Sequence, residues 1–340
     1  MKKNASYKIA WMTFIANIFI LLEHANLGGS DLNNPIGITM NVCSEMATPM
    51  MGWFFFCTSY LFFRNINFFQ EIFERLKKRY YTLFIPYVIW NTIGGVLHFL
   101  GGDFTGNMSP LYIFRHTYLF YDGVGCGDGP LWYVARLFSY LLLAPIIYSL
   151  LKKRSVVLFS LVELSLIILN VLAKTNNYHV LFFFPIFLIG AYIGINSSRE
   201  LEDFLDNNKA NYTLVLLLGL VLVLCTWTRN LINIPAIPII YRIVAVALII
   251  YALRNLGRVP APNVFVSSAG MYLYCAHDLV YRVVRVIVFK LGNNATQNQL
   301  MLVILSAVIL VSSWAFMNRF FPKLLNLLSG GRNSRKISVE

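Results

Sequence analysis

Two ionisable residues end the first long apolar run of this 340-residue chain. The run reads KIAWMTFIANIFILLEHA over residues 8–25, and Glu23 and His24 stand in its last turn. Ionisable side chains are costly at membrane depth, so they mark candidate functional sites. A neutral imidazole accepts a proton near neutral pH, which makes His24 a candidate general base. The alternative is a histidine whose ring only reaches the membrane interface.

Two glutamates are candidate catalytic partners of His24. Glu23 precedes it and points about 100° away around a helix, so the two side chains do not share a face. Glu45 stands just before the second apolar run. Either carboxylate can orient an imidazole, and the sequence does not choose between them.

Further polar residues interrupt later apolar runs. Arg282 and Arg285 are three residues apart and share one face of a helix. These side chains cannot face lipid cheaply, so they either line a polar path or form structural ion pairs with acids such as Glu163 and Asp278. The candidates for substrate binding are Arg136, Arg242, His277 and Arg282. No metal-type spacing surrounds any histidine, and no metal site is expected.

A basic run follows the second apolar segment, in ERLKKRYYTLFIPYVIW (74–90). Clustered Lys and Arg bind phosphate groups well. Arg75, Lys77, Lys78 and Arg79 are therefore candidates to hold a polyphosphate such as coenzyme A. A run of this kind also acts as a plain topology determinant.

Composition places the chain in a membrane. Hydrophobic residues make up 58% and charged residues 13%, against about 25% charged in soluble domains. Unbroken apolar runs predict an all-α, polytopic membrane protein. The ten predicted spans are 8–25, 46–63, 80–100, 130–150, 155–173, 180–195, 211–228, 236–254, 264–289 and 299–321.

The charge distribution predicts the orientation of these spans. With the N-terminus inside, twenty of the 28 Lys and Arg residues fall in inside segments and four in outside segments. Basic residues favour the cytoplasmic side, so both termini are expected there, in the inner (plasma) membrane. The net charge of +13 then reflects topology, and no nucleic-acid partner is expected. His24 lies about 24 Å along the helix from Lys8, toward the outer face.

One domain accounts for nearly all of the chain. Residues 1–325 read as a single transmembrane domain, and 326–340 as a polar cytoplasmic tail without fixed structure.

Residues 110–120 form a short amphipathic patch within the longest connection. The five cysteines lack CxxC spacing and are interpreted as inert thiols.

Several segments together resemble the acyltransferase-3 family of integral membrane enzymes that move acyl groups onto sugars. FFFCTSYLFF (54–63) is similar to a second-span FFxxSGYL segment, with Thr58 and Ser59 where Ser-Gly is usual. ERLKKRYYTLFIPYVIW, PLWYVARLFSYLLLAP (130–145) and FFFPIFLIGAYIG (182–194) match further family segments. SSAGMYLYCAHDLV (267–280) resembles a late S-x-x-YxLYxxH-x-P stretch. The resemblance extends over nearly the whole chain.

The resemblance assigns roles and also shows two departures. It places the catalytic role on His24 and an acyl-CoA role on Arg75, Lys78 and Arg79. Thr13 stands where the family usually has an arginine, and Lys8 is the nearest earlier cation. The proline expected after the late histidine is absent, because HDL replaces H-x-P.

These observations predict a membrane-embedded acyltransferase. An acyl group, acetyl in the first instance, would move from cytoplasmic acyl-CoA to a hydroxyl of a cell-surface glycan or its precursor. Acyl-CoA would be a co-substrate, with no tightly bound cofactor, and the partners would be a carbohydrate acceptor, membrane lipids and glycan-assembly proteins. A transporter or flippase, or a non-catalytic member of a glycan-assembly system, is the alternative.

Overall fold

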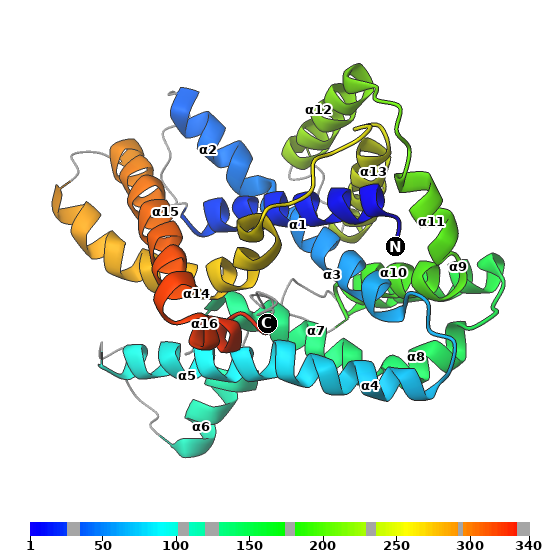
Figure 1. Cartoon of the computed structure of the whole chain (residues 1–340), viewed down its shortest axis with the longest axis horizontal. Helices are drawn as coiled ribbons and strands as arrows, with labels where there is room; N and C mark the ends of the chain where they lie inside the picture. Colours follow the sequence, from blue (N-terminus) through cyan, green and yellow to red (C-terminus); the bar gives the residue numbers. More distant parts are fainter. Residues whose placement is uncertain are drawn as a thin grey trace, which may run out of the picture. The chain divides into compact units, whose positions relative to one another are not determined.

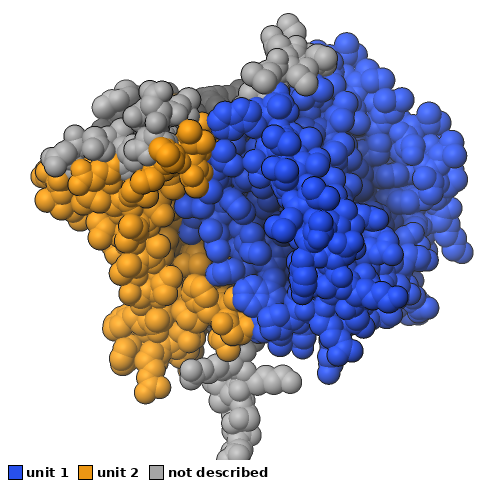
Figure 2. Space-filling view, turned by 90° about the horizontal axis from the view of Figure 1, so that it is seen from above, with its two compact units in different colours: residues 1–23, 42–75, 140–262 blue, residues 24–41, 76–139, 263–340 orange. Residues whose placement is uncertain are grey.

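The computed structural model describes residues 1–25, 35–100, 109–119, 129–173, 181–228, 236–291 and 295–331. The described residues are helical throughout and contain no β-strand, only one isolated bridge between Ala210 and Leu256 (Figure 1). The chain divides into two compact units, coloured separately in Figure 2. Unit 1 contains residues 1–23, 42–75 and 140–262, and unit 2 contains 24–41, 76–139 and 263–340.

Every predicted span falls on a helix or a helix pair. The helices of unit 1 are α1 (Lys3–His24, as far as Glu23), α3 (Ala47–Phe63), the start of α4 (Gln70–Arg79), α8 (Ala144–Leu151), α9 (Val156–Leu172), α10 (Phe184–Asn196), α11 (Ser198–Leu205), α12 (Tyr212–Thr228) and α13 (Ile237–Arg254). Unit 2 holds most of α2 (Pro35–Glu45), the π-helical turn Tyr80–Phe84, α5 (Ile85–Leu100), α6 (Pro110–Phe114), a second π-helical turn Arg115–Leu119, the 3₁₀ turn Gly129–Leu131, most of α7 (Trp132–Leu142), α14 (Val264–Leu291), α15 (Ala295–Phe320) and α16 (Pro322–Leu328).

Fewer than ten of these helices are long and apolar enough to cross a membrane by themselves. Among the described residues four qualify by length and composition: Lys3–His24, Gln70–Leu100, Ile237–Arg254 and Gln297–Phe320. A fifth arises if Gly129–Leu142 and Ala144–Leu151, bent by 56°, form one span. Three more apolar helices are shorter, namely α9, α10 and α12. The figure of ten crossings stays a prediction.

The core of unit 1 forms where α3 packs against α10. Most of α3 is buried, and Phe55 stacks on Phe183 with ring centroids 4.5 Å apart. A Cβ at Gly190 would collide with the Ser59 hydroxyl and the Phe56 carbonyl. Glycine therefore allows the two helices to approach closely, as small residues commonly do in membrane bundles.

The basic segments of unit 1 that were predicted to lie inside meet at one end of that unit. Glu202 of α11 binds the Arg64 guanidinium at 2.5 Å and the N-terminal amine at 3.7 Å. The Lys2 ammonium binds Asp203 at 2.9 Å, which raises the pKa of Lys2. Sequence-distant segments thus share one side, as the predicted topology requires; which side of the membrane it faces stays a prediction.

In unit 2, α14 packs against α15. Their interface contains the apolar cluster of Ala25, Tyr281, Val284, Val288 and Leu302. This cluster fixes the residue that follows His24 against the middle of α14. The burial of apolar area holds these segments together, at roughly 25 cal/mol for each Å² removed from solvent.

The first residues of the predicted tail, 326–331, are part of the described structure. Residues 326–328 belong to α16, whose Leu328 carbonyl accepts a hydrogen bond from the Trp90 indole at 3.0 Å. Gly330, with φ of 68°, lies against the Thr82 carbonyl, where a Cβ would not fit. The rest of the predicted tail, 332–340, lies outside the described residues. The amphipathic patch at 110–120 is helical from Pro110 to Leu119.

Candidate active site

One face of α14 gathers polar and ionisable side chains in unit 2. Residues three and four apart lie on one face of a helix. In α14 this spacing aligns Tyr274, His277, Asp278, Tyr281 and Arg282. Such a concentration of polar groups on a largely apolar helix marks a candidate functional site.

His24 joins this face at the end of α1. Its backbone carbonyl accepts a hydrogen bond from the Arg285 guanidinium at 2.7 Å. The last carbonyls of a helix lack partners within the helix and carry partial negative charge, so a cation is well placed there. Arg285 therefore fixes the end of α1 and with it the His24 side chain.

The two imidazoles are neighbours. The ring centroids of His24 and His277 are 5.0 Å apart and the ring planes are tilted by 47°. His277 is completely buried, whereas His24 retains partial exposure. His24 is therefore the more accessible ring of the pair. Asp278 and Arg285 lie close enough to act on His24 electrostatically.

The backbone of α14 sets the tautomer of His277. Its Nδ1 lies 2.6 Å from the Tyr274 carbonyl oxygen. A carbonyl oxygen only accepts, so Nδ1 carries the hydrogen and Nε2 holds a free lone pair. That Nε2 is buried and has no hydrogen-bond partner among the described residues. An unpaired buried acceptor costs about 1–3 kcal/mol, so its retention points to a use.

A second polar chain extends from His277 along α14. The Arg282 guanidinium binds the Asp278 carboxylate through Nε at 2.9 Å and through a terminal nitrogen at 2.8 Å. The same guanidinium contacts both ring nitrogens of His98, at the end of α5. A guanidinium only donates, so no more than one of these ring nitrogens accepts from it.

The sequence did not single out His98 or Tyr274. His98 stands near the end of the predicted span 80–100, the same kind of position that drew attention to His24. That signal was present and was missed. Tyr274 contributes through its backbone carbonyl, for which the sequence holds no signal.

The catalytic role of Glu23 and Glu45, the predicted partners of His24, stays a prediction. Glu23 has an exposed side chain. Glu45, the last residue of α2, belongs to unit 1, whereas His24 belongs to unit 2. Within unit 2 the acid on the histidine-bearing helix is Asp278, which already binds Arg282.

Arg75 has structural partners. Its guanidinium donates to the carbonyls of Phe62 at 2.5 Å and Arg64 at 2.7 Å, and one nitrogen lies 3.6 Å from Glu71. These bonds close the C-terminal end of α3. Lys78 is exposed and Arg79 partly buried, both on α4. Of Arg75, Lys78 and Arg79, Lys78 is therefore the side chain most open to a phosphate group.

The structure shows aromatic neighbours for two of the candidate substrate-binding arginines. Arg242 of α13 is 4% exposed. It donates to the Pro238 carbonyl at 2.6 Å and stacks over the Phe182 and Phe183 rings at 4.6 and 5.1 Å. Arg136 of α7 acts electrostatically on Tyr87. The cluster thus includes His277 and Arg282 from the predicted set.

The described residues contain no group of three His, Cys, Asp or Glu side chains placed to bind a metal. The described cysteines are free thiols: Cys43, Cys57, Cys225 and Cys275. Cys126 lies outside the described residues. The chemistry that these residues offer is proton transfer between imidazoles, assisted by arginine.

These features define a class: an all-helical membrane protein with two neighbouring histidines, a pair whose chemistry suits acid–base catalysis. The chain belongs to the acyltransferase-3 family, since the family profile described as an acyltransferase domain matches residues 7–318, nearly its whole length. The protein is therefore a membrane acyltransferase. No curated protein and no solved structure gives a match to the chain.

Proposed function

We propose that this enzyme moves an acetyl group from cytoplasmic acetyl-CoA to a hydroxyl of a cell-surface glycan or its precursor. The observation that carries the proposal is the His24–His277 pair. It combines one partly exposed imidazole with a buried neighbour whose Nε2 is free to accept. Acyl transfer to a hydroxyl needs a base of this kind.

The reaction follows from these groups. His24 takes the proton of the acceptor hydroxyl while the oxygen attacks the thioester carbonyl carbon and forms the new C–O bond. The C–S bond then breaks, and the coenzyme A thiolate receives the proton from His24. The Nε2 lone pair of His277 accepts a hydrogen bond from the His24 ring while that ring is positively charged.

Arg282 is the proposed stabiliser of negative charge at the thioester oxygen. Its guanidinium is held by Asp278 and contacts His98, so its orientation is fixed before substrate arrives. Preorganised donors of this type contribute strongly in a site with little water. Asp278 and His98 are positioning residues for Arg282.

The proposed donor site uses the basic run at the start of the Gln70–Leu100 helix. Lys78 and Arg79 would hold the phosphates of coenzyme A, while Arg75 supports the end of α3. Acetyl-CoA is a co-substrate, and no tightly bound cofactor is proposed. Both termini are placed in the cytoplasm and the protein in the inner (plasma) membrane, by the distribution of Lys and Arg.

The experiment measures transfer of labelled acetyl from acetyl-CoA in membranes that contain the enzyme or a variant. We expect His24→Ala to lower the rate by about 10²–10⁴-fold, the usual contribution of a general base. Glu23→Gln, which changes the adjacent and exposed carboxylate, is the matched control and should retain most activity. Full activity of His24→Ala would remove this residue from the mechanism.

Donor binding is tested separately. The purified full-length protein should bind acetyl-CoA, and Lys78→Ala should weaken that binding. Substrate movement across liposome membranes with no acyl donor present, without acetyl-CoA binding, would favour the transporter alternative.

A further inference from the structure

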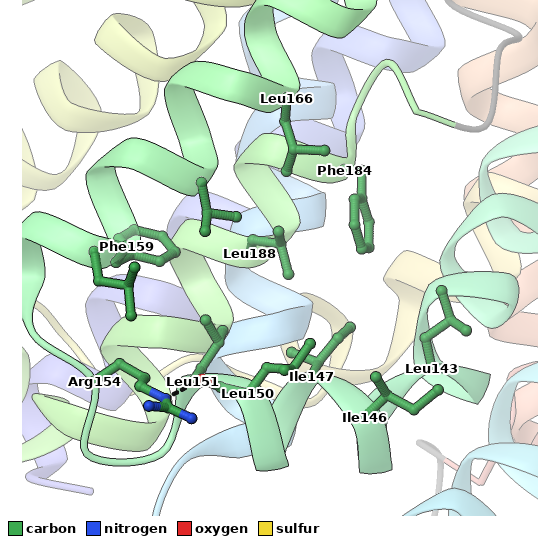
Figure 3. A pocket seen from close by; sticks show the side chains of 12 residues that line it. Leu143, Ile146, Ile147, Leu150, Leu151, Arg154, Phe159, Leu166, Phe184 and Leu188 are labelled. Carbon is green, nitrogen blue, oxygen red and sulfur yellow. Dashed lines mark hydrogen bonds between the residues drawn. The ribbon is translucent and has the colours of Figure 1, made fainter.

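A cavity of about 440 Å³ lies within unit 1, between α8, α9 and α10 (Figure 3). Eleven of its twelve lining side chains are aliphatic or aromatic. Ile146 and Leu150 come from α8, Val162 and Leu166 from α9, and Leu188 from α10. Its volume falls in the range of about 300–1,000 Å³ typical of small-molecule sites. None of the residues assigned to catalysis lines this cavity.

The helices that frame the cavity present apolar side chains outward. On α8, Ile146 and Leu150 are each 59% exposed, and on α9, Leu161 and Leu164 are 56% and 54% exposed. In a membrane protein such surfaces face lipid. The cavity therefore opens among lipid-facing side chains, where acyl chains are the available apolar molecules.

One end of the cavity carries a positive charge. Figure 3 shows Arg154 at that end, the charged residue among the lining side chains. Its Nε donates to the Leu150 carbonyl at 3.1 Å, which fixes the side chain along α8. The two terminal nitrogens make no hydrogen bond with any described residue. They remain available to an anion.

The turn that holds Arg154 is fixed from several sides. Asn196 of α10 accepts from the Lys153 backbone N–H and donates to the Leu151 carbonyl, each at 3.0 Å. The Tyr192 hydroxyl donates to the Arg154 carbonyl at 3.0 Å. Lys153 has a left-handed φ of 57°, a conformation that is kept only when neighbours enforce it. The guanidinium is thus preorganised at the mouth of an apolar cavity.

The start of α9 adds to this positive end. Its first turn contains no acidic residue, and Ser155 caps it. The N-terminus of a helix carries partial positive charge, which favours a nearby anion. Lys152 and Lys153, both exposed, stand in the same turn. On the predicted topology this turn is cytoplasmic, the side on which anionic lipids lie.

We propose that this cavity binds one anionic phospholipid, with an acyl chain between α8, α9 and α10 and the phosphate on the Arg154 guanidinium. The arrangement matches a molecule with one apolar chain and one negative headgroup. A neutral lipid fills the apolar part equally well, but leaves the guanidinium without an anion. This inference does not depend on the proposed reaction.

The test compares phosphatidylglycerol with phosphatidylcholine of the same acyl chains. Delipidated, purified full-length protein is titrated with each lipid, and bound lipid is measured by native mass spectrometry. We expect phosphatidylglycerol to bind about fivefold more tightly, the effect of one partly exposed charge interaction. Arg154→Ala should abolish the preference, whereas Lys209→Ala, an exposed charge elsewhere, should keep it.

A second pair of variants tests the cavity itself. Val162→Trp fills the cavity and should lower the binding of both lipids. Leu164→Trp adds the same bulk to the outer face of α9, outside the lining, and should not. Equal affinity for the two lipids, an unchanged preference in Arg154→Ala, or equal binding by the two tryptophan variants would overturn the proposal. So would displacement of the lipid by inorganic phosphate alone.

Discussion

The free Nε2 of His277 leads to a prediction that separates catalysis from folding. Two substitutions divide the functions of the ring. His277→Asn places an amide nitrogen near the position of Nδ1, so it can keep the bond to the Tyr274 carbonyl, but it removes Nε2. His277→Gln extends a polar atom toward the position of Nε2 and loses the Nδ1 donor. The first variant should lose activity and the second should retain part of it.

The expected loss of kcat follows from the strength of the hydrogen bond between His277 and the charged His24 ring. A hydrogen bond to a charged group contributes about 1.5–3 kcal/mol, and each 1.36 kcal/mol changes a rate about tenfold. Loss of Nε2 should therefore lower kcat of His277→Asn by about 10- to 100-fold. The KM for acetyl-CoA should not change, because the interaction forms only while His24 is charged.

The stability of His277→Asn should change much less than its kcat. Nε2 has no partner in the resting enzyme, so its removal leaves no hydrogen bond broken. The smaller side chain leaves a small cavity, whose cost is about 1 kcal/mol. Thermal unfolding in detergent should thus change little while kcat falls. A His277→Asn enzyme with wild-type kcat, or one whose activity loss follows unfolding alone, would refute the reasoning.

The remaining predictions concern parts of the fold with clear partners. Arg75→Ala should lower the free energy of unfolding by about 1.5–3 kcal/mol, since its guanidinium binds carbonyls at the end of α3, and should leave the KM for acetyl-CoA unchanged. Lys78→Ala should instead raise that KM about fivefold without affecting unfolding. Gly190→Ala should destabilise by about 1–3 kcal/mol, because a Cβ there collides with α3. Gly219→Ala, whose Cβ would meet nothing, should be neutral or stabilising by up to about 1 kcal/mol. Thermal unfolding and donor titration distinguish all four outcomes.

Much of the helical content could be predicted, because long apolar runs have few other conformations available in a membrane. The short amphipathic helices were not predicted. α11 contains Glu202 and Asp203 and lacks a long apolar run, yet it ties Arg64 and the N-terminus together. α2 and α16 are similarly short. Their stability comes from tertiary contacts, which a single sequence does not reveal.

The members of the site could be predicted better than their pairing. His24, His277 and Arg282 stand out because each is a polar residue within an apolar helix. His24 and His277, however, are separated by most of the chain, so only packing could show that their rings are neighbours. Arg75 shows the converse. It fits a phosphate-binding pattern by composition, but local geometry directs its donors to backbone carbonyls.

The structure shows what Thr13 does at the position where the family usually has an arginine. The Thr13 hydroxyl donates to the Ile9 carbonyl at 2.7 Å and accepts from the Trp53 indole at 3.3 Å, so it is part of the packing of unit 1. Lys8 cannot take over, because its buried ammonium binds three backbone carbonyls, at 2.8, 3.0 and 3.3 Å. Neither position therefore supplies a free cation to His24. The cations in contact with the histidine cluster come from α14, where Arg285 holds the end of α1 and Arg282 carries the remaining donors. If the arginines of α14 take the role of the missing arginine on α1, Thr13→Arg should not raise activity. Arg282→Ala, in contrast, should abolish activity.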